Sequence, residues 1–348
     1  MRAMRIPSGG RPVSEIDEFD LIESVRKTMI LHRTKRLTQG IGDDAAVWKP
    51  RPGHELVVTN DMLIENVDFR VPWIDFRDLG HKALAVNLSD IAAMGALPRM
   101  AIISLGLRGD ERDREVIEFY QGMNGLARQF RTVIAGGDIS DSPLGIVISV
   151  TVIGESSAAG KPLMLRSAAN VGDVIAVTGP LGLAAAGLRI YQHDLRDIDG
   201  APAMRAHFDR PTPRIREGRL LVRCGVRAAI DLSDGLLGDL PKICEASGVS
   251  ATIDATKIPI PSSIRWSFTD WFDVATRGGE DFELLFTAKP DVFHRVCRAF
   301  RRAGLAEPCR IGEIQQAGSD GSEIRLRQQD GRVETIEPGA FVHFGPKS

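Results

Sequence analysis

Apolar residues in the first half of the chain alternate between helical and extended spacing. From Ser14, which forms a capping-box pattern with Asp17, they recur about every third position and predict a helix that runs to about Leu31. Other segments are shorter and bounded by turn residues, which is typical of strands. Strands are predicted at 55–59, 100–107, 132–135 and 145–153, and further helices at 79–94 and 111–130.

The second half of the chain repeats this alternation. Strands are predicted at 174–178, 228–230 and 282–287, and helices after Gly182, from Pro213, up to Ser247 and from Pro290, before a β-rich tail. Strands and helices mixed in both halves indicate two α/β or α+β domains. The small, polar segment 155–162 is the candidate linker. We expect a loose N-terminal arm over 1–13, an N-terminal domain over 14–155 and a C-terminal domain over 163–348.

Composition and charge exclude several classes of protein. The 348 residues include 44 Lys+Arg and 46 Asp+Glu, so the basic excess of a nucleic-acid-binding protein is missing. A hydrophobic content of 43% argues against disorder, and the longest apolar run, 145–154, is too short to span a bilayer. The four cysteines show no CxxC spacing. We therefore expect a cytoplasmic protein with no nucleic-acid or membrane partner.

The common nucleotide-binding and hydrolase motifs are missing from the sequence. The nearest Walker A candidate, from Gly154 to Lys161, has one residue too many between its glycines and is followed by Pro162. No GxGxxG, GxSxG or HExxH pattern occurs. Instead, Asp or Glu recurs beside Gly or other small residues where an apolar run ends. This pattern occurs at 42–44, 59–61, 136–138, 231–235 and 278–281.

Carboxylates at strand ends can converge on one edge of a sheet, and Mg²⁺ prefers oxygen ligands of this kind. Each carboxylate alone is explained as well by a helix cap or a turn, but their recurrence favours a metal site. Asp90 is the most informative case, because it lies between Leu88 and Ile91 in a helix that reads as buried. An unpaired carboxylate is costly there, although a solvated helix face is the alternative.

Six segments together resemble the motifs of thiamine-monophosphate kinases, in the order of that family. They are GIGDDAAV (40–47), TNDMLIENVDF (59–69), HKALAVNLSDIAAMGALP (81–98), AGGD (135–138), AIDLSDGL (229–236) and GGEDFELLFT (278–287). The likeness extends from about residue 15 to the C-terminus. These kinases belong to an ATP-binding superfamily that includes aminoimidazole ribonucleotide synthetase.

The resemblance implies a fold and an activity. The fold is the two-domain aminoimidazole ribonucleotide synthetase-like fold, α/β plus α+β, in which the N-terminal sheet pairs with that of a second subunit to form a barrel across a homodimer. The activity is direct transfer of the γ-phosphoryl group of ATP to thiamine monophosphate, which gives thiamine diphosphate. Several Mg²⁺ ions are implied, with ATP as co-substrate. No covalent or acid–base residue is expected, because positioning and charge neutralisation dominate phosphoryl transfer.

The resemblance also implies roles for individual residues. The metal ligands would be Asp44, Thr59, Asn60, Asp61, Asp90, Asp138, Asp231 and Asp234. The ATP contacts would be Tyr120, Gly137, Asp138, Arg166 and Ser233. Asp68, Glu280 and Phe341 stand where the family contacts the thiamine substrate, whose thiazolium cation suits an acidic or aromatic wall. For Tyr120 and Phe341, a packing role is the alternative.

Asp68 departs from the family pattern. The family usually has His there, in a Gly-Val-His-Phe run, whereas this chain reads Asn66-Val67-Asp68-Phe69. An ionised Asp donates no hydrogen bond to a phosphate, so Asp68 faces the cationic part of the substrate, binds another metal, or marks altered specificity. The alternative function is therefore a paralogous kinase of the same fold with a different acceptor. A non-catalytic regulator would be expected to have lost some of the carboxylates.

Overall fold

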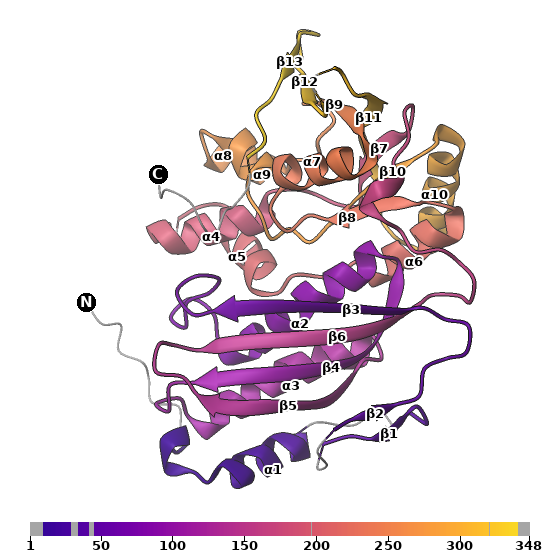
Figure 1. Ribbon diagram of the computed structural model, residues 1–348. Coiled ribbons are helices and arrows are strands. Elements are labelled where there is room, and N and C mark those ends of the chain that lie inside the picture. Colours follow the sequence, from indigo (N-terminus) through magenta and orange to yellow (C-terminus); the bar gives the residue numbers. More distant parts are fainter. Residues whose placement is uncertain (1–9, 29–33, 42–44, 196, 320, 340–348) are drawn as a thin grey trace. The chain divides into compact units, whose positions relative to one another are not determined.

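The computed structural model describes residues 10–28, 34–41, 45–195, 197–319 and 321–339. The chain divides into two compact units. Unit 1 comprises Met1–Ile91 and Leu97–Gly160, and unit 2 comprises Ala92–Ala96 and Lys161–Ser348. Each unit has its own sheet, and Figure 1 colours the chain from indigo to yellow along the sequence. Among the described helices, none has the length and apolar character needed to cross a bilayer.

Unit 1 is built on a four-stranded sheet with the strand order β3-β6-β4-β5, one face of which is covered by helices α2 and α3 (Figure 1). β3 pairs with β6 in antiparallel fashion, and β4 pairs with β5 in parallel. The remaining elements are η1, α1 and the small β1-β2 sheet. The bounds are η1 Val13–Glu15, α1 Glu18–Thr28, β1 Leu37–Gln39, β2 Val47–Trp48, β3 Leu56–Ile64, α2 Phe76–Ala93, β4 Ala96–Leu107, α3 Asp113–Gln129, β5 Val133–Asp141 and β6 Val147–Ser156.

Two glycines explain how closely α2 and α3 approach each other. A Cβ on Gly80 would lie 1.8 Å from the carbonyl oxygen of Phe119, and a Cβ on Gly122 would lie 1.8 Å from that of Arg77. Any side chain at either position would therefore push the two helices apart. The close packing of these helices gives α2 a fixed position over the sheet, and α2 carries Asp90.

The other face of the sheet carries exposed apolar side chains along β3. Side chains alternate between the two faces of a strand, so Thr59, Asp61 and Leu63 point toward α2. The intervening residues are exposed, and Val58, at 64% exposure, is the most exposed of the apolar ones. The exposed apolar residues of β3 are Leu56, Val58, Met62 and Ile64.

Unit 2 contains a seven-stranded sheet with the order β13-β12-β9-β11-β7-β10-β8. The neighbouring strands are antiparallel except for β12 and β9. The bounds of its strands are β7 Val174–Val177, β8 Ala228–Asp231, β9 Val249–Asp254, β10 Leu284–Ala288, β11 Cys309–Gln316, β12 Ile324–Arg327 and β13 Val333–Thr335. Its helices are η2 Arg166–Ala168, α4 Leu183–His193, α5 Ala201–Asp209, α6 Ile215–Cys224, α7 Leu236–Ser247, α8 Ser262–Ser267, α9 Trp271–Thr276 and α10 Pro290–Arg302.

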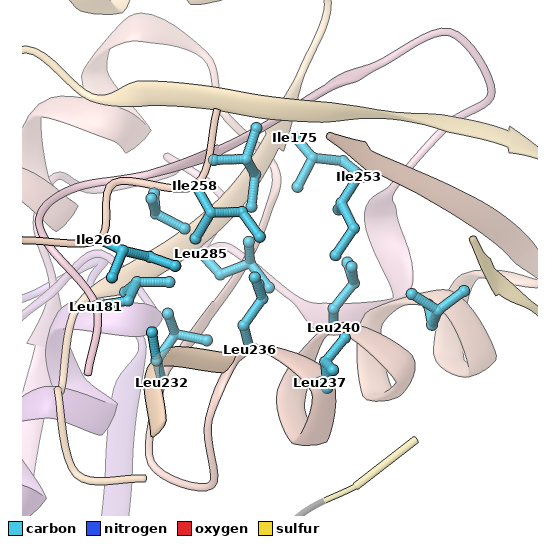
Figure 2. Close-up of a cluster of buried hydrophobic side chains, with 14 of the residues drawn as sticks. Ile175, Leu181, Leu232, Leu236, Leu237, Leu240, Ile253, Ile258, Ile260 and Leu285 are labelled. Atoms are coloured by element: carbon cyan, nitrogen blue, oxygen red, sulfur yellow. The ribbon is translucent and has the colours of Figure 1, made fainter. Parts of the chain in front are cut away.

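The core of unit 2 lies between this sheet and α7. Figure 2 shows Leu236, Leu237 and Leu240 of α7 gathered with Ile175 and Leu285 of the sheet in one buried cluster. Leu232, from the loop that precedes α7, belongs to the same cluster. The apolar residues of the sequence DLSDGLL therefore anchor the loop, and the polar residues between them are held in place.

The structure corrects three expectations about the chain. The candidate carboxylates at 59–61 and 136–138 do not lie at strand ends, because β3 and β5 continue through them as paired strands. Residues 10–13 are not loose: Val13 N–H donates to the carbonyl of Glu111 at 2.8 Å, and Asp113 N–H donates to that of Arg11 at 3.0 Å. The candidate linker begins too early, because Glu155 and Ser156 belong to β6.

Glu155 holds the β1-β2 region against the end of β6. Its fully buried carboxylate accepts hydrogen bonds from Arg51 Nε at 2.5 Å and from Arg99 Nε at 3.1 Å, and Trp48 Nε1 lies 3.4 Å away. Burial would raise the pKa of this carboxyl, but the hydrogen bonds from Arg51, Trp48 and Arg99 outweigh it and lower the pKa to about 2. The ionised form is therefore the stabilising one.

Asp281 holds the N-terminus of α4. Its side chain accepts hydrogen bonds from the backbone N–H of Gly182 at 2.6 Å and of Ala184 at 3.2 Å, donors that α4 leaves unsatisfied. Burial, together with the nearby charge of Glu283, raises the pKa of Asp281 to about 7 despite these hydrogen bonds. The carboxyl thus takes up a proton in the folded protein at a pH where it is ionised in the unfolded chain.

Replacing Glu155 with Gln should lower the free energy of unfolding by about 3 kcal/mol at pH 7, because two half-buried guanidinium groups lose their buried counter-charge. Since folding lowers the pKa from 4.5 to about 2, the wild-type advantage should vanish as the pH falls through that interval. Urea denaturation at several pH values measures both effects. Glu118→Gln, in the exposed pair with Arg114, is the control and should cost less than about 0.5 kcal/mol. Equal losses for the two variants would contradict this account.

Replacing Asp281 with Asn should remove a pH dependence of stability. Because folding raises this pKa from 3.8 to about 7, the stabilisation by Asp281 is full below pH 4 and falls as the pH rises to 7. The melting temperature of the wild type minus that of the variant should therefore be smaller at pH 8 than at pH 5. Asp291→Asn, an exposed first-turn Asp of α10, should show no such trend. A difference that grows with pH would refute the prediction.

Candidate functional site

In unit 1, β3 and α2 bring Thr59, Asp61 and Asp90 together. The hydroxyl of Thr59 donates to Asp90 Oδ2, and the backbone N–H of Asp61 donates to Asn87 Oδ1 at 3.1 Å. Asn87 and Asp90 are three residues apart and so share one face of α2. A hydroxyl on the adjacent strand is therefore one partner of Asp90 in its otherwise buried helix.

The carboxylates of Asp61, Asp68 and Asp90 act on one another at this point of unit 1. The pKa of Asp61 is raised to about 6, first by burial and then by the carboxylates of Asp90 and Asp68. Carboxylates that repel one another in this way attract a cation, and the side-chain ligands that they and Thr59 offer are all oxygen atoms. Thr59, Asp61 and Asp90 therefore fit a hard divalent ion such as Mg²⁺.

The structure does not bring the side chain of Asn60 to this group. Its Nδ2 donates to Ser149 Oγ at 3.0 Å, to the carbonyl of Val150 at 3.1 Å and to Thr151 Oγ1 at 2.9 Å. Ser149 and Thr151 are half-buried residues on the open face of β6. Because adjacent residues of a strand point to opposite faces, Asn60 lies across the sheet from Thr59 and Asp61.

Asp68 closes the turn that follows β3. Its Oδ2 accepts a hydrogen bond from the backbone N–H of Ile64 at 2.7 Å, while its own N–H donates to the carbonyl of Ile64 at 3.0 Å. Asn66, between them, has a positive φ of 68°. One carboxylate oxygen of Asp68 is thus engaged by the backbone, while its charge acts on Asp61.

Gly137, Asp138 and Tyr120 also lie in unit 1. Asp138 is exposed on β5, and burial together with its charge raises the pKa of the buried Tyr120, which places the two residues near each other. A Cβ on Gly137 would lie 2.0 Å from the carbonyl oxygen of Ile103. Close pairing with β4 is therefore sufficient to explain Gly137, whereas a Cβ on Gly136 would meet no atom.

In unit 2, the DLSD loop (231–234) and the GGED loop (278–281) are hydrogen-bonded to each other. Glu280 N–H donates to the carbonyl of Ser233 at 2.9 Å, and Phe282 N–H donates to that of Leu232 at 2.9 Å. Glu280 and Phe282 have positive φ angles of 70° and 51°, which are strained for residues other than glycine. The flanking bonds of Asp281 to α4 support this conformation. The predicted Ser233 and Glu280 are thus adjacent.

The two aspartates of the DLSD loop have different surroundings. Asp231 is buried at the end of β8, opposite Leu284. Asp234 is partly exposed, and its Oδ2 accepts a hydrogen bond from Lys242 Nζ at 2.6 Å. Burial alone would lower the pKa of Lys242. Its hydrogen bonds to Asp234 and Asp239 outweigh the effect of burial, so the pKa of Lys242 is raised. Asp234 is therefore paired with an ammonium group.

The C-terminal segment is held beside the same loops. Pro241 lies inside α7 and has no N–H to donate to the carbonyl of Leu237, four residues earlier. That carbonyl accepts a hydrogen bond from Gly339 N–H at 3.3 Å, and Arg277 Nη2 donates to the carbonyl of Glu337 at 3.3 Å. Residues 337–339 are thus attached to α7 and to the residue that precedes the GGED loop.

The remaining predicted residues are Arg166, Asp44 and Phe341. Arg166 is exposed in η2, where its carbonyl accepts a hydrogen bond from Ser247 Oγ at 2.8 Å. Asp44 and Phe341 lie outside the described residues. Within the described parts of the chain, no group of three or more His, Cys, Asp or Glu side chains is placed to hold one ion. The predicted ligands are divided between the two units.

Sequence reasoning missed several residues that support the site. Two of them, Asn87 and Asp281, stand inside the quoted motifs without a predicted role, and the others lie outside those motifs. Each is identified by its contact with a predicted residue or loop. A sequence signal existed only for Lys242, whose position three residues after Asp239 on a helix predicts an ion pair between the two. These residues are Asn87, Asp239, Lys242, Arg277 and Asp281.

Comparison with known proteins identifies the family. The family models described as AIR synthase related protein, N-terminal domain and C-terminal domain, match residues 42–156 and 170–325. The thiamine-monophosphate kinase of Salmonella typhimurium is 40% identical over 314 residues, which cover 88% of this chain and 91% of that protein.

Two solved structures resemble the chain over most of its length. The crystal structure of thiamine-monophosphate kinase from Stenotrophomonas maltophilia K279a has a TM-score of 0.79 at 36% identity and covers 90% of this chain and 97% of that one. AaThiL complexed with AMPPCP and TMP has a TM-score of 0.73 at 30% identity and covers 99% of this chain and 100% of that one. The expected two-domain fold and the resemblance are confirmed. The chain belongs to the thiamine-monophosphate kinase family of AIR synthase-related proteins.

Proposed function

We propose that this protein transfers the γ-phosphoryl group of ATP to the phosphate of thiamine monophosphate, giving thiamine diphosphate. The observation that carries the proposal is the placement of Thr59, Asp61 and Asp90, an all-oxygen group with two carboxylates, on matched family motifs. A relative that aligns over nearly the whole chain is complexed with AMPPCP and TMP. That pair of ligands supports ATP and thiamine monophosphate as substrates here.

Charge explains why such a reaction needs an acidic site with metal ions. ATP and thiamine monophosphate are both anions, so their phosphates repel each other. Mg²⁺, when bound, neutralises the phosphate oxygens and favours an in-line arrangement. Thr59, Asp61 and Asp90 of unit 1, with Asp138, are the proposed ligands there, and Asp231 and Asp234 are those of unit 2. Asp44 is proposed on the resemblance alone.

The remaining contacts follow from the chemistry of the substrates. Arg166 is exposed, and its planar guanidinium suits bidentate contact with phosphate oxygens. Ser233 and Tyr120, with the backbone at Gly137, are proposed nucleotide contacts. The carboxylate of Glu280, next to Ser233 in space, would face the thiazolium cation. Phe341 is proposed beside it because residues 337–339 are attached near the GGED loop.

A second candidate function is a kinase of the same fold with a different acceptor, and Asp68 favours it. The turn geometry offers a simpler reason for Asp68, because its Oδ2 caps the backbone N–H of Ile64. An acid at this position serves the turn whichever acceptor is used. Thiamine monophosphate therefore stays our preferred acceptor.

We also propose that two copies of the chain pair through the open face of the unit 1 sheet. This is the barrel pairing implied by the family resemblance. The support on this chain is the row of exposed apolar residues on β3, Leu56, Val58, Met62 and Ile64, which only Asn60 interrupts, because soluble monomers rarely expose large apolar patches. We also propose a cytoplasmic location, because the four free cysteines suit a reducing compartment.

Purified protein with ATP and Mg²⁺ should convert thiamine monophosphate to thiamine diphosphate, measured by oxidation to fluorescent thiochrome derivatives and chromatography. Asp61→Asn should lower kcat by about 100-fold or more, because a charged ligand of the neutralising cation is lost. Asp330→Asn, an exposed control, should match the wild type. Binding of ATP without turnover of thiamine monophosphate would favour the second acceptor, and full activity of Asp61→Asn would refute the metal assignment.

Replacing Val58 with Lys should separate the proposed dimer, because it places a charge at the centre of an apolar contact between copies. Light scattering coupled to size-exclusion chromatography should give twice the chain mass for the wild type and one chain mass for the variant. Val333→Lys, at 49% exposure on β13, is the matched control and should remain dimeric. A wild-type monomer would contradict the proposed pairing.

A further inference from the structure

The ammonium group of Lys242 lies between two carboxylates at the DLSD loop. Its Nζ donates to Asp234 Oδ2 at 2.6 Å and to Asp239 Oδ1 at 2.7 Å. Asp239 is fully buried, and its other oxygen accepts the backbone N–H of Asp234 at 2.9 Å. The loop, the first turn of α7 and Lys242 therefore form one closed hydrogen-bonded unit.

This position matters because Asp234 is one of the carboxylates proposed to bind a metal ion. A metal ion and an ammonium group use the same acceptor oxygens, so they compete for them. Lys242 also has room to leave, since its side chain is 35% exposed and ends in a single charge on a flexible stem. Asp239, which is buried, stays where the helix fixes it.

We propose that Lys242 is a tethered cation that competes with a divalent metal ion for Asp234. In the metal-free protein, its ammonium neutralises Asp234 and keeps the DLSD loop next to α7. A divalent ion binds Asp234 by displacing the ammonium group of Lys242. The loop therefore binds metal more weakly than its carboxylates would without Lys242. The proposal rests on the proposed function, because it takes Asp234 to be a metal ligand.

A second lysine in unit 2 forms an ordinary ion pair, in the turn that follows β9. Lys257 Nζ lies 3.2 Å from Asp254 Oδ2, also at a spacing of three residues, and the Lys257 side chain is 55% exposed. Asp254 is far from the DLSD loop in the sequence and carries no proposed ligand role. Lys257 therefore provides a matched control for the loss of one lysine charge from unit 2.

The test is direct binding of Mn²⁺ to the full-length, nucleotide-free protein, followed by the paramagnetic resonance signal of the free ion. Lys242→Met should bind Mn²⁺ about fivefold or more tightly than the wild type, because a competing charge has been removed. Lys257→Met should leave the affinity unchanged. In an Asp234→Asn background, Lys242→Met should produce no gain, since the shared ligand is missing.

Equal Mn²⁺ affinity of Lys242→Met and wild type would overturn the proposal, as would an equal gain in the Asp234→Asn background. If circular dichroism shows that Lys242→Met is unfolded, the reason is that Asp239 is left buried without its ammonium partner. In that case the Mn²⁺ affinity of the double variant Asp239→Asn/Lys242→Met is compared with that of Asp239→Asn. Failure of the proposed function would be seen separately, as a folded wild type without turnover of thiamine monophosphate. The Mn²⁺ measurement needs neither ATP nor acceptor.

Discussion

Mutual repulsion among carboxylates is the constraint on which the rest of this structure depends. A chain that collects acidic groups near one another loses stability unless each has a hydrogen-bond donor or a cation within reach. Unit 1 supplies Asp90 with the hydroxyl of Thr59, and unit 2 supplies Asp234 with Lys242. The tight packing of α2 against α3 and the buried leucines of the DLSD loop and α7 hold these groups in place while the charges repel one another.

The alternation of elements could be predicted from sequence because it depends on local spacing. Helices α2 and α3 begin and end within a few residues of their predicted bounds, and α10 begins at the predicted Pro290. The strands were harder, since β3 and β5 continue through Asp61 and Asp138, where the sequence suggested that they stop. Pairing with a neighbouring strand determined their length, and pairing is a non-local property.

The candidate site shows the same division between local and non-local information. Motif residues such as Thr59, Asp61 and Asp90 could be named in advance because their order along the chain carries the signal. Asp281 could not, because its carboxylate satisfies the first turn of a helix about a hundred positions away in the sequence. Asn60 was grouped with its neighbours on β3, although the alternation of a strand places its side chain on the opposite face.

Pro241 has a consequence for how the end of the chain is held. In an uninterrupted helix, every interior carbonyl already has a donor, so a passing segment must displace a helical hydrogen bond in order to attach. Here the carbonyl of Leu237 has no such competitor, and Gly339 N–H satisfies it without any loss to α7. Pro241 thus leaves a backbone acceptor in the middle of α7 to which the C-terminal segment binds.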